Sequence, residues 1–520
     1  MSRGALALLL IATALVFLPL SQAGLISDDV SLVLHNQWAA EGSVIGRAFS
    51  HHLWASAPAG DATGPYYRPL MTLAIAADHH LFGESAAAWH LHSLAWHLLC
   101  VGLLSRLLAG LGRPGAATLA CVVFALHPVM IEPVAFVAAR NDSMACAGVL
   151  AALILLEEEG PGRAALAALA LLAALLCKES ALAGLPMALL LDRARGAPIR
   201  WARYAGLCAS VAIWAFLRSQ ANISPLALGM EPSRALAALG HYAGLLVWPP
   251  GSSPATELAT LEPRWLPTLA GLALLAALVR RGGALGWAGL AMALVALAPG
   301  VMGALSAGYL AHRYLYLPMV GLALLIFAGA PPRWDRGLSM VLGLALALSN
   351  VREQRIWSTN RAYFEHAYAV SPSSRNACGV FTARQSEGET AELERWMRLA
   401  LRPPPSEFCC FNATRWPLEA GQPERAVALG ELALNSGCTG TPELVAPLAM
   451  SLALTGRWDA AEEWASKLED DPWGYTPVVR AAAAMRRGDE GVLRALEERP
   501  EERRPLRERV GWLLGQPASP

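Results

Sequence analysis

Two adjacent carboxylates, Asp28 and Asp29, follow the first apolar run of the chain within a few residues. An acidic pair in such a place can serve as a general base, bind a divalent cation or cap a helix. Glu132 and Asp142 stand in similar places, close to the end of an apolar run. Because an isolated charge is expensive to bury there, we expect these acids to pair with cations or to act on a ligand.

Basic side chains accompany these acids and supply the other half of a polar site. They are Arg68, Arg140, Lys178 and Arg313. A cation that faces a cavity suits a phosphate group, whereas a simple ion pair of Lys178 with the neighbouring Glu179 would be structural. For Arg313 and Tyr314 the alternative interpretation is an aromatic belt with an interfacial arginine.

Histidines gather in the same stretches and raise the question of a metal. The histidines concerned are His79, His80, His90, His92 and His97, and Asp78 directly precedes the first of them. His79 and His80 point to different faces of a helix, and His90 and His97 lie two turns apart. This spacing favours histidines at a helix interface over a zinc site. No cofactor is predicted with certainty, and a divalent cation held by the two adjacent acids stays open.

The composition places these residues in a membrane protein. Of 520 residues, 55% are hydrophobic and 16% charged, with a mean hydropathy of +0.38. A soluble domain is about 45–50% apolar and about 25% charged. Since a helix needs about 20 mostly apolar residues to cross a bilayer, we predict about eleven spans. They lie near 4–24, 86–110, 115–137, 143–157, 164–178, 180–192, 203–218, 265–280, 284–303, 310–330 and 337–351.

The distribution of arginine predicts the orientation, because cytoplasmic loops retain an excess of Lys and Arg. With the N-terminus in the cytoplasm, every inside turn is basic, Arg106 and Arg163 being examples, and the candidate residues fall outside. An odd number of spans then places the tail outside. A cleaved signal peptide is an alternative for the first segment and leaves residue 25 onward outside as well. We therefore predict a multi-pass protein of the inner, cytoplasmic membrane with one polar site at its outer surface.

Charge excludes one class of partner. Residues 1–351 hold 20 basic and 17 acidic side chains, and residues 352–520 hold 21 and 24. Neither part has the clustered excess of cations that displaces counterions from nucleic acid. Nucleic acid is therefore not predicted as a partner, whereas membrane lipid is.

From Trp357 onward the sequence becomes charged and alanine-rich, with a helical pattern. Glycines recur at 388, 421, 456 and 488, and the spacings from Gly421 to Ala426 and from Gly456 to Ala461 are equal, as in tetratricopeptide repeats. Such arrays usually bind peptides, so we predict recruitment of an acceptor or partner; a helical cap on the outer face is the alternative. Cysteines 378, 409, 410 and 438 allow one or two disulfides of undetermined connectivity.

Six motifs follow one another between about residues 20 and 350. They are Asp28-Asp29, Tyr66-Tyr67-Arg68-Pro69-Leu70, Trp89-His90-Leu91 with His97, His127-Pro128-Val129-x-x-Glu132-x-Val134 followed by Arg140-x-Asp142, Lys178-Glu179-Ser180, and Arg313-Tyr314-Leu315-Tyr316-Leu317-Pro318. In this order they resemble the transmembrane and tetratricopeptide-repeat O-mannosyltransferases and their bacterial relatives, a group of GT-C glycosyltransferases. The chain departs from the expected pattern at Asp78-His79 and at His312, which bears on the identity of sugar or acceptor.

The resemblance implies a multi-span enzyme that moves a sugar from a polyprenyl-phosphate donor to an acceptor on the outer face, with inversion as the family's expectation. It implies that Asp28 or Asp29 is the catalytic base or helps to bind a cation, and it does not decide which of the two residues this is. It maps the His-Pro motif onto His127 and Glu132. It implies that Arg140, Lys178 and Arg313 are candidates for binding the phosphate of the lipid donor. Mannose is the sugar that the family favours.

The leading hypothesis is thus an all-α, polytopic GT-C-like catalytic domain at 1–351 with an extracytoplasmic repeat domain at 352–515, acting on a protein or glycan acceptor. The predicted catalytic residues are Asp28, Asp29 and Glu132. The predicted substrate-binding residues are Arg68, Asp78, His90, His127, Arg140, Asp142, Lys178, Glu179, Arg313 and Tyr314. The rivals are a lipid-linked glycan transporter, which would place charges near mid-membrane, and an inactive membrane scaffold with a peptide-binding tail.

Overall fold

The computed structural model describes residues 1–39, 44–57, 64–158, 160–198, 201–224, 231–249, 253–258, 261–262, 264–331, 336–468 and 474–489. It divides into two compact units, Met1–Ser371 and Pro372–Pro520, and both are built of helices. The predicted all-α class is confirmed. The last part of the predicted repeat domain, residues 490–515, lies outside the described residues.

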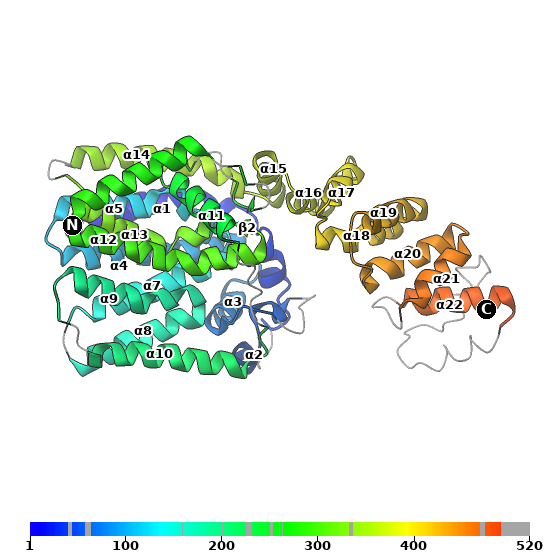
Figure 1. Cartoon of the computed structure of the whole chain (residues 1–520), viewed down its shortest axis with the longest axis horizontal. Helices are drawn as coiled ribbons and strands as arrows, with labels where there is room; N and C mark the ends of the chain where they lie inside the picture. The colour runs from blue at the N-terminus through cyan, green and yellow to red at the C-terminus, as the bar shows by residue number, and fades with distance from the viewer. Residues whose placement is uncertain are drawn as a thin grey trace. The chain divides into compact units, whose positions relative to one another are not determined.

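Long helices lying side by side form the first unit (Figure 1). Its helices are α1 (Arg3–Phe17), α2 (Val44–Ser50), α3 (Pro69–Phe82), α4 (Ala86–Ala109), α5 (Pro114–Leu126), α6 (Glu132–Ala135), α7 (Arg140–Leu155), α8 (Pro161–Cys177), α9 (Gly184–Ala194), α10 (Trp201–Gln220), α11 (Pro232–Leu245), α12 (Trp265–Ala307), α13 (Pro318–Gly329), α14 (Arg336–Glu353) and α15 (Asn360–Val370). Short 3-10 turns, including η5 (Val137–Ala139), η6 (Glu179–Ala183) and η7 (His312–Leu315), connect them.

These helices fit a polytopic membrane protein. By length and composition, four of the described helices are apolar enough to cross a bilayer, and the bent pair Pro114–Leu126 and Pro128–Ala135 would make a fifth. Shorter helices such as α8 and α13 occupy other predicted spans. The 43-residue α12 covers two predicted spans and is broken at Gly283, whose φ of 56° favours glycine. The count of about eleven spans stays a prediction.

Two local features carry the functional side chains to one end of the bundle. The chain bends by 55° after α5, where Pro128 follows His127, as the prolines of this stretch predict. A two-stranded ladder of β1 (Thr256–Glu257) and β2 (Tyr309–Leu310) pairs Thr256 with Leu310 in antiparallel register. This ladder fixes the segment between α12 and α13 that holds Arg313.

Antiparallel helix pairs form the second unit. Its helices are α16 (Ser374–Ser386), α17 (Leu393–Ala400), α18 (Glu407–Glu419), α19 (Pro423–Asn435), α20 (Pro442–Leu454), α21 (Trp458–Ser466) and α22 (Tyr475–Arg487). Of the four periodic glycines, 388, 421 and 456 each follow the first helix of a pair and 488 follows α22, and all four have φ near +75°. A left-handed residue there ends a helix, and glycine adopts it without strain. Their spacing therefore marks the pairs; whether these are tetratricopeptide repeats stays a prediction.

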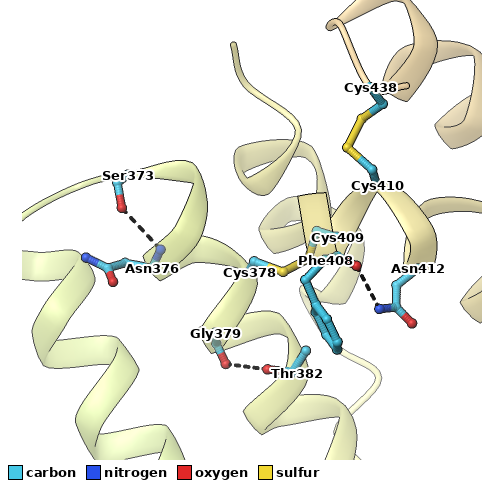
Figure 2. The surroundings of a disulfide bond; sticks show 10 residues. All are labelled: Ser373, Asn376, Cys378, Gly379, Thr382, Phe408, Cys409, Cys410, Asn412 and Cys438. Carbon is cyan, nitrogen blue, oxygen red and sulfur yellow. Dashed lines mark hydrogen bonds between the residues drawn. A yellow bond between two sulfur atoms is a disulfide. The ribbon is translucent and has the colours of Figure 1, made fainter. Parts of the chain in front are cut away.

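Two disulfides join neighbouring helices of this unit. Cys378 of α16 is bonded to Cys409, and the adjacent Cys410 is bonded to Cys438, which follows α19. Figure 2 shows that the two neighbouring cysteines of α18 thus tie this helix to a different segment on each side. All four cysteines of the second unit form these bonds, which cross-link α16, α18 and the residue Cys438 after α19.

Candidate active site

A cavity of about 130 Å³ lies at one end of the first unit. It is lined where α7 and α13 begin and where α8 and α12 end, so antiparallel helices bring these four ends together. The segments before α2 and before α3 complete it. Its charged lining consists of Asp28, Arg68, Asp142, Lys178, Glu179 and Arg313. Six predicted site residues from widely separated parts of the sequence therefore meet in one place.

Three ion pairs hold the cations of the cavity. The guanidinium of Arg68 binds Glu179 through two bonds, from Nε to Oε2 at 3.0 Å and from the terminal nitrogen to Oε1 at 2.8 Å. Lys178 donates to Asp142 at 2.6 Å. Each arginine has five N–H donors and lysine three, so both side chains keep donors beyond these bonds. They can therefore bind an anion while their pairs stay intact.

Arg313 is the third cation, and Glu132 positions it. One oxygen of Glu132 accepts from the backbone N–H of Arg313 at 2.7 Å, and the other accepts from its guanidinium. The same guanidinium donates to the hydroxyl of Tyr309 at 3.0 Å. Glu132 is fully buried and does not line the cavity. The predicted catalytic acid thus lies behind the cation, where its carboxylate fixes Arg313.

The two adjacent acids have different surroundings. Asp29 is fully buried, and its oxygens accept from the backbone N–H groups of Ala138 at 2.6 Å, Val137 at 3.1 Å and Ile26 at 3.4 Å. Burial raises the pKa of Asp29 to about 7, although these three bonds act in the opposite direction. Asp28 is partly exposed and lines the cavity. Asp28 therefore lines the cavity, whereas Asp29 joins the first loop to η5.

Asp78 and Arg140 form a separate buried cluster. The Arg140 guanidinium, itself fully buried, donates to Asp78, and Nδ1 of His92 lies 2.9 Å from the same carboxylate. Burial would raise the pKa of Asp78, but His92 and Arg140 together lower it. The Arg140 side chain also lies over the ring of Trp89, 5.5 Å from its centre. Neither Asp78 nor Arg140 lines the cavity, so this pair joins α3, α4 and α7.

The two remaining histidine candidates bind backbone carbonyls. His90 lies within 3.4 Å of the carbonyl oxygen of Val134 and within 3.3 Å of that of Gly24. His127 lies 3.3 Å from the carbonyl oxygen of Leu246 and accepts from the N–H that follows Pro128. Both histidines are buried outside the cavity lining. Their positions suit the helix-interface interpretation.

Other polar side chains of the cavity carry no charge and were not among the predicted site residues. They include Tyr66, Asn141, Ser180 and Tyr309. Tyr66 lies under the Arg68 guanidinium, 4.6 Å from its ring centre. Predicted Tyr314 also lines the cavity, with Lys178 5.7 Å from its ring centre. The signals that point to Ser180 and Asn141 are the Lys178-Glu179-Ser180 motif for Ser180 and, for Asn141, its place directly before the predicted Asp142.

The described residues contain no group of three or more His, Cys, Asp or Glu side chains arranged to hold a metal ion. Within the cavity, the carboxylates of Asp142 and Glu179 are bonded to cations. One acid of the first loop, Asp28, thus lines the same cavity as three cations and several aromatic rings. Such a set can accept a proton on one side and stabilise a leaving phosphate on the other.

The fold and this cavity define a multi-pass helical membrane protein with a polar, charged site at one end of its bundle. Among curated proteins, protein O-mannosyl-transferase Tmtc2 of Drosophila melanogaster is 33% identical over 187 residues, which are 34% of this chain and 20% of the relative. Human protein O-mannosyl-transferase TMTC4 is 30% identical over 130 residues, 22% of this chain and 18% of the relative. Human TMTC3 is 24% identical over 163 residues, 30% and 18% of the two chains.

The chain therefore resembles the transmembrane and tetratricopeptide-repeat O-mannosyltransferases. The matched stretch covers about a fifth of the length of these relatives. No family model and no solved structure matches the chain.

Proposed function

We propose that this chain is a membrane glycosyltransferase of the GT-C type that moves a sugar from a polyprenyl-phosphate donor to a hydroxyl group of a protein. Mannose is the sugar named by the curated relatives. The observation that carries the proposal is the cavity, which is lined by Asp28 and by the three cations Arg68, Lys178 and Arg313. These residues come from segments up to 285 positions apart (313 − 28), yet they line one space.

In the proposed reaction Asp28 takes the proton of the acceptor hydroxyl as its oxygen attacks the anomeric carbon. The bond from that carbon to the phosphate oxygen breaks, and polyprenyl phosphate leaves with the bonding electrons. Lys178 and the two arginines bind the phosphate as its charge increases. General-base catalysis of this kind contributes roughly 10²–10⁴-fold to the rate.

Glu132, Asp142 and Glu179 act as positioning residues in this proposal. Each carboxylate holds one cation at the cavity: Glu132 holds Arg313, Asp142 holds Lys178 and Glu179 holds Arg68. Because a long cationic side chain loses rotamer entropy when it binds, fixing it beforehand lowers the cost of binding phosphate. The same pairs keep the charges compensated before the donor arrives.

We further propose that the cavity faces the outside of the inner membrane, with the N-terminus in the cytoplasm. The basic turns at the opposite ends of the predicted spans support this orientation. The two disulfides of the second unit support it too, because such bonds persist in oxidising compartments. The helix pairs of this unit would then recruit the acceptor peptide.

The test is transfer by the purified full-length chain in lipid nanodiscs. Labelled sugars on polyprenyl phosphate, mannose among them, are offered with Ser- and Thr-containing peptides, with nucleotide sugars as control donors. We expect labelled peptide from a polyprenyl-phosphate sugar and none from a nucleotide sugar. Movement of the lipid-linked sugar across the bilayer without labelled peptide would favour the transporter, and neither activity would favour the scaffold. A parallel reaction with EDTA tests whether a divalent cation takes part.

A further inference from the structure

Two neutral polar groups in the cavity lack partners within the protein. The side-chain oxygen of Asn141 and the hydroxyl of Ser180 are both shielded from solvent and have no hydrogen-bond partner among the described residues. Both residues line the cavity, and Asn141 is 1% exposed. A buried acceptor left without a donor costs about 1–3 kcal/mol. Because the folded chain keeps two such groups at its proposed site, we expect a bound ligand to supply their missing hydrogen bonds.

The orientation of the Asn141 amide follows from its own bond. Its amide nitrogen donates to the carbonyl oxygen of Ala138 at 3.0 Å, which leaves the amide oxygen as the atom without a partner. This oxygen can only accept a hydrogen bond. The hydroxyl of Ser180 can donate or accept. A ligand that satisfies both must bring at least one O–H or N–H donor.

Their place in the cavity indicates which part of the ligand they meet. Asn141 directly precedes Asp142, and Ser180 comes two residues after Lys178. Since Lys178 and Asp142 are bonded to each other, the two neutral groups flank the same ion pair. In the proposed function Lys178 binds the donor phosphate. The sugar is attached directly to that phosphate, so its hydroxyls come next to this pair.

We propose that Asn141 and Ser180 bind hydroxyl groups of the donor sugar and thereby contribute to the choice of sugar. The assignment rests on the proposed function. The adjoining Lys178 and Asp142 are charged and bonded to each other, whereas these two groups are neutral and unpaired, which suits an uncharged polyol rather than a second phosphate. A site built to bond a hydroxyl also rejects ligands that lack it, because its own buried groups are then left unpaired.

Binding to the full-length chain in nanodiscs tests the assignment, with two probes and no acceptor present. One probe is polyprenyl phosphate carrying mannose, and the other is polyprenyl phosphate alone. The variants Ser180→Ala and Asn141→Leu are expected to weaken binding of the sugar-bearing lipid by about 3- to 10-fold each, as the loss of one hydrogen bond does. Their affinity for the bare lipid phosphate should match that of the wild type.

A matched control lies on the same helix. The hydroxyl of Ser143 is buried and donates to the carbonyl oxygen of Arg140 at 2.8 Å, and Ser143 does not line the cavity. Ser143→Ala should lower the melting temperature and leave both lipid affinities unchanged. Ser180→Ala should maintain the melting temperature and weaken binding of the sugar-bearing lipid alone, since its hydroxyl makes no bond within the described part of the chain.

The outcomes separate the two proposals. Equal loss of affinity for both lipids, or no loss for either, overturns the sugar assignment of Asn141 and Ser180 and leaves the phosphate site standing. If the wild type binds neither lipid, the proposed function itself fails. Selective loss for the sugar-bearing lipid, with the melting temperature of Ser180→Ala maintained, supports the assignment.

Discussion

Replacing Lys178 with methionine separates the role of this lysine in folding from its proposed role in donor binding. Lys178 and Asp142 are bonded at 2.6 Å, and their side chains are only 7% and 5% exposed. Removing one partner of a buried pair leaves an uncompensated charge and costs about 3–5 kcal/mol. The entropy of unfolding is about 2.1 cal/mol/K per residue, or about 0.8 kcal/mol/K for the unit Met1–Ser371. We therefore expect the melting temperature to fall by about 4–6 °C.

The double variant Lys178→Met with Asp142→Asn should recover most of this loss, since no buried charge remains. It should not recover donor binding. Loss of a bond between a charged donor and phosphate costs about 1.5–3 kcal/mol, so the affinity for polyprenyl phosphate should fall about 10- to 150-fold in both variants.

Melting temperature followed by intrinsic fluorescence and binding of labelled polyprenyl phosphate are measured on the same preparations. Arg163→Met is the matched control, because its pair with Glu158 is about half exposed and worth at most about 1 kcal/mol. Wild-type affinity for the lipid phosphate in the double variant would refute the phosphate role of Lys178. An unchanged melting temperature in the single variant would refute the buried pair.

Three further predictions concern the parts of the chain that hold the site. Because burial raises the pKa of Asp29 to about 7, folding stability should fall by about 4 kcal/mol as the pH rises from about 4 to 7, with the carboxyl protonated in the folded state and ionised in the unfolded one. Asp29→Asn lacks this component, so the unfolding free energy of the wild type should fall relative to that of the variant by about 4 kcal/mol between pH 4 and 7; a difference that stays constant with pH would contradict the assignment. Gly289→Ala should destabilise the first unit by about 1–3 kcal/mol, because the new Cβ would lie 2.6 Å from the backbone nitrogen of Leu325. Gly162→Ala, whose Cβ would meet nothing within 4 Å, should not, and equal melting temperatures of the two variants would refute the close packing of α12 on α13. Reduction of the disulfides, which span separations of 31 and 28 residues, should lower the stability of the second unit by about 3–4 kcal/mol per bond in chemical denaturation. If an alkylating reagent modifies the four cysteines of the second unit before reduction, the two disulfides do not form.

Features that depend on local chemistry could be predicted from the sequence. Apolar runs gave helices close to the predicted ranges, and Pro128 ended α5 as expected. The periodic glycines end helices because their left-handed conformation suits glycine alone. In each case the deciding interaction lies within a few residues along the chain.

Features that depend on distant pairing could not be predicted. Arg68 meets Glu179 across 111 residues, and Arg313 meets Glu132 across 181. The sequence offered Lys178 and Glu179 as partners of each other, whereas they bind different side chains. The sequence also could not distinguish the roles of Asp28 and Asp29, since two adjacent residues of the same type differ only in the direction in which the folded backbone points their side chains.

The contacts of residues 352–371 depend on the fold as well. The polar composition begins near Trp357, but the backbone N–H of Ser27 donates to the side chain of Asn360 at 2.6 Å. Trp357 and Tyr363 are buried with the first unit. Asn360 thus holds the residue directly before Asp28, and α15 belongs to the surroundings of the cavity.

The central claim is that Asp28 is the base of a sugar transfer carried out in this cavity. The most direct measurement compares transfer from labelled polyprenyl-phosphate mannose to a peptide by the wild type, Asp28→Asn, and Glu84→Gln, an exposed carboxylate outside the cavity. We predict that Asp28→Asn lowers kcat about 10²- to 10⁴-fold with an unchanged melting temperature and unchanged donor affinity, while Glu84→Gln keeps full activity. Full transfer by Asp28→Asn would contradict the account.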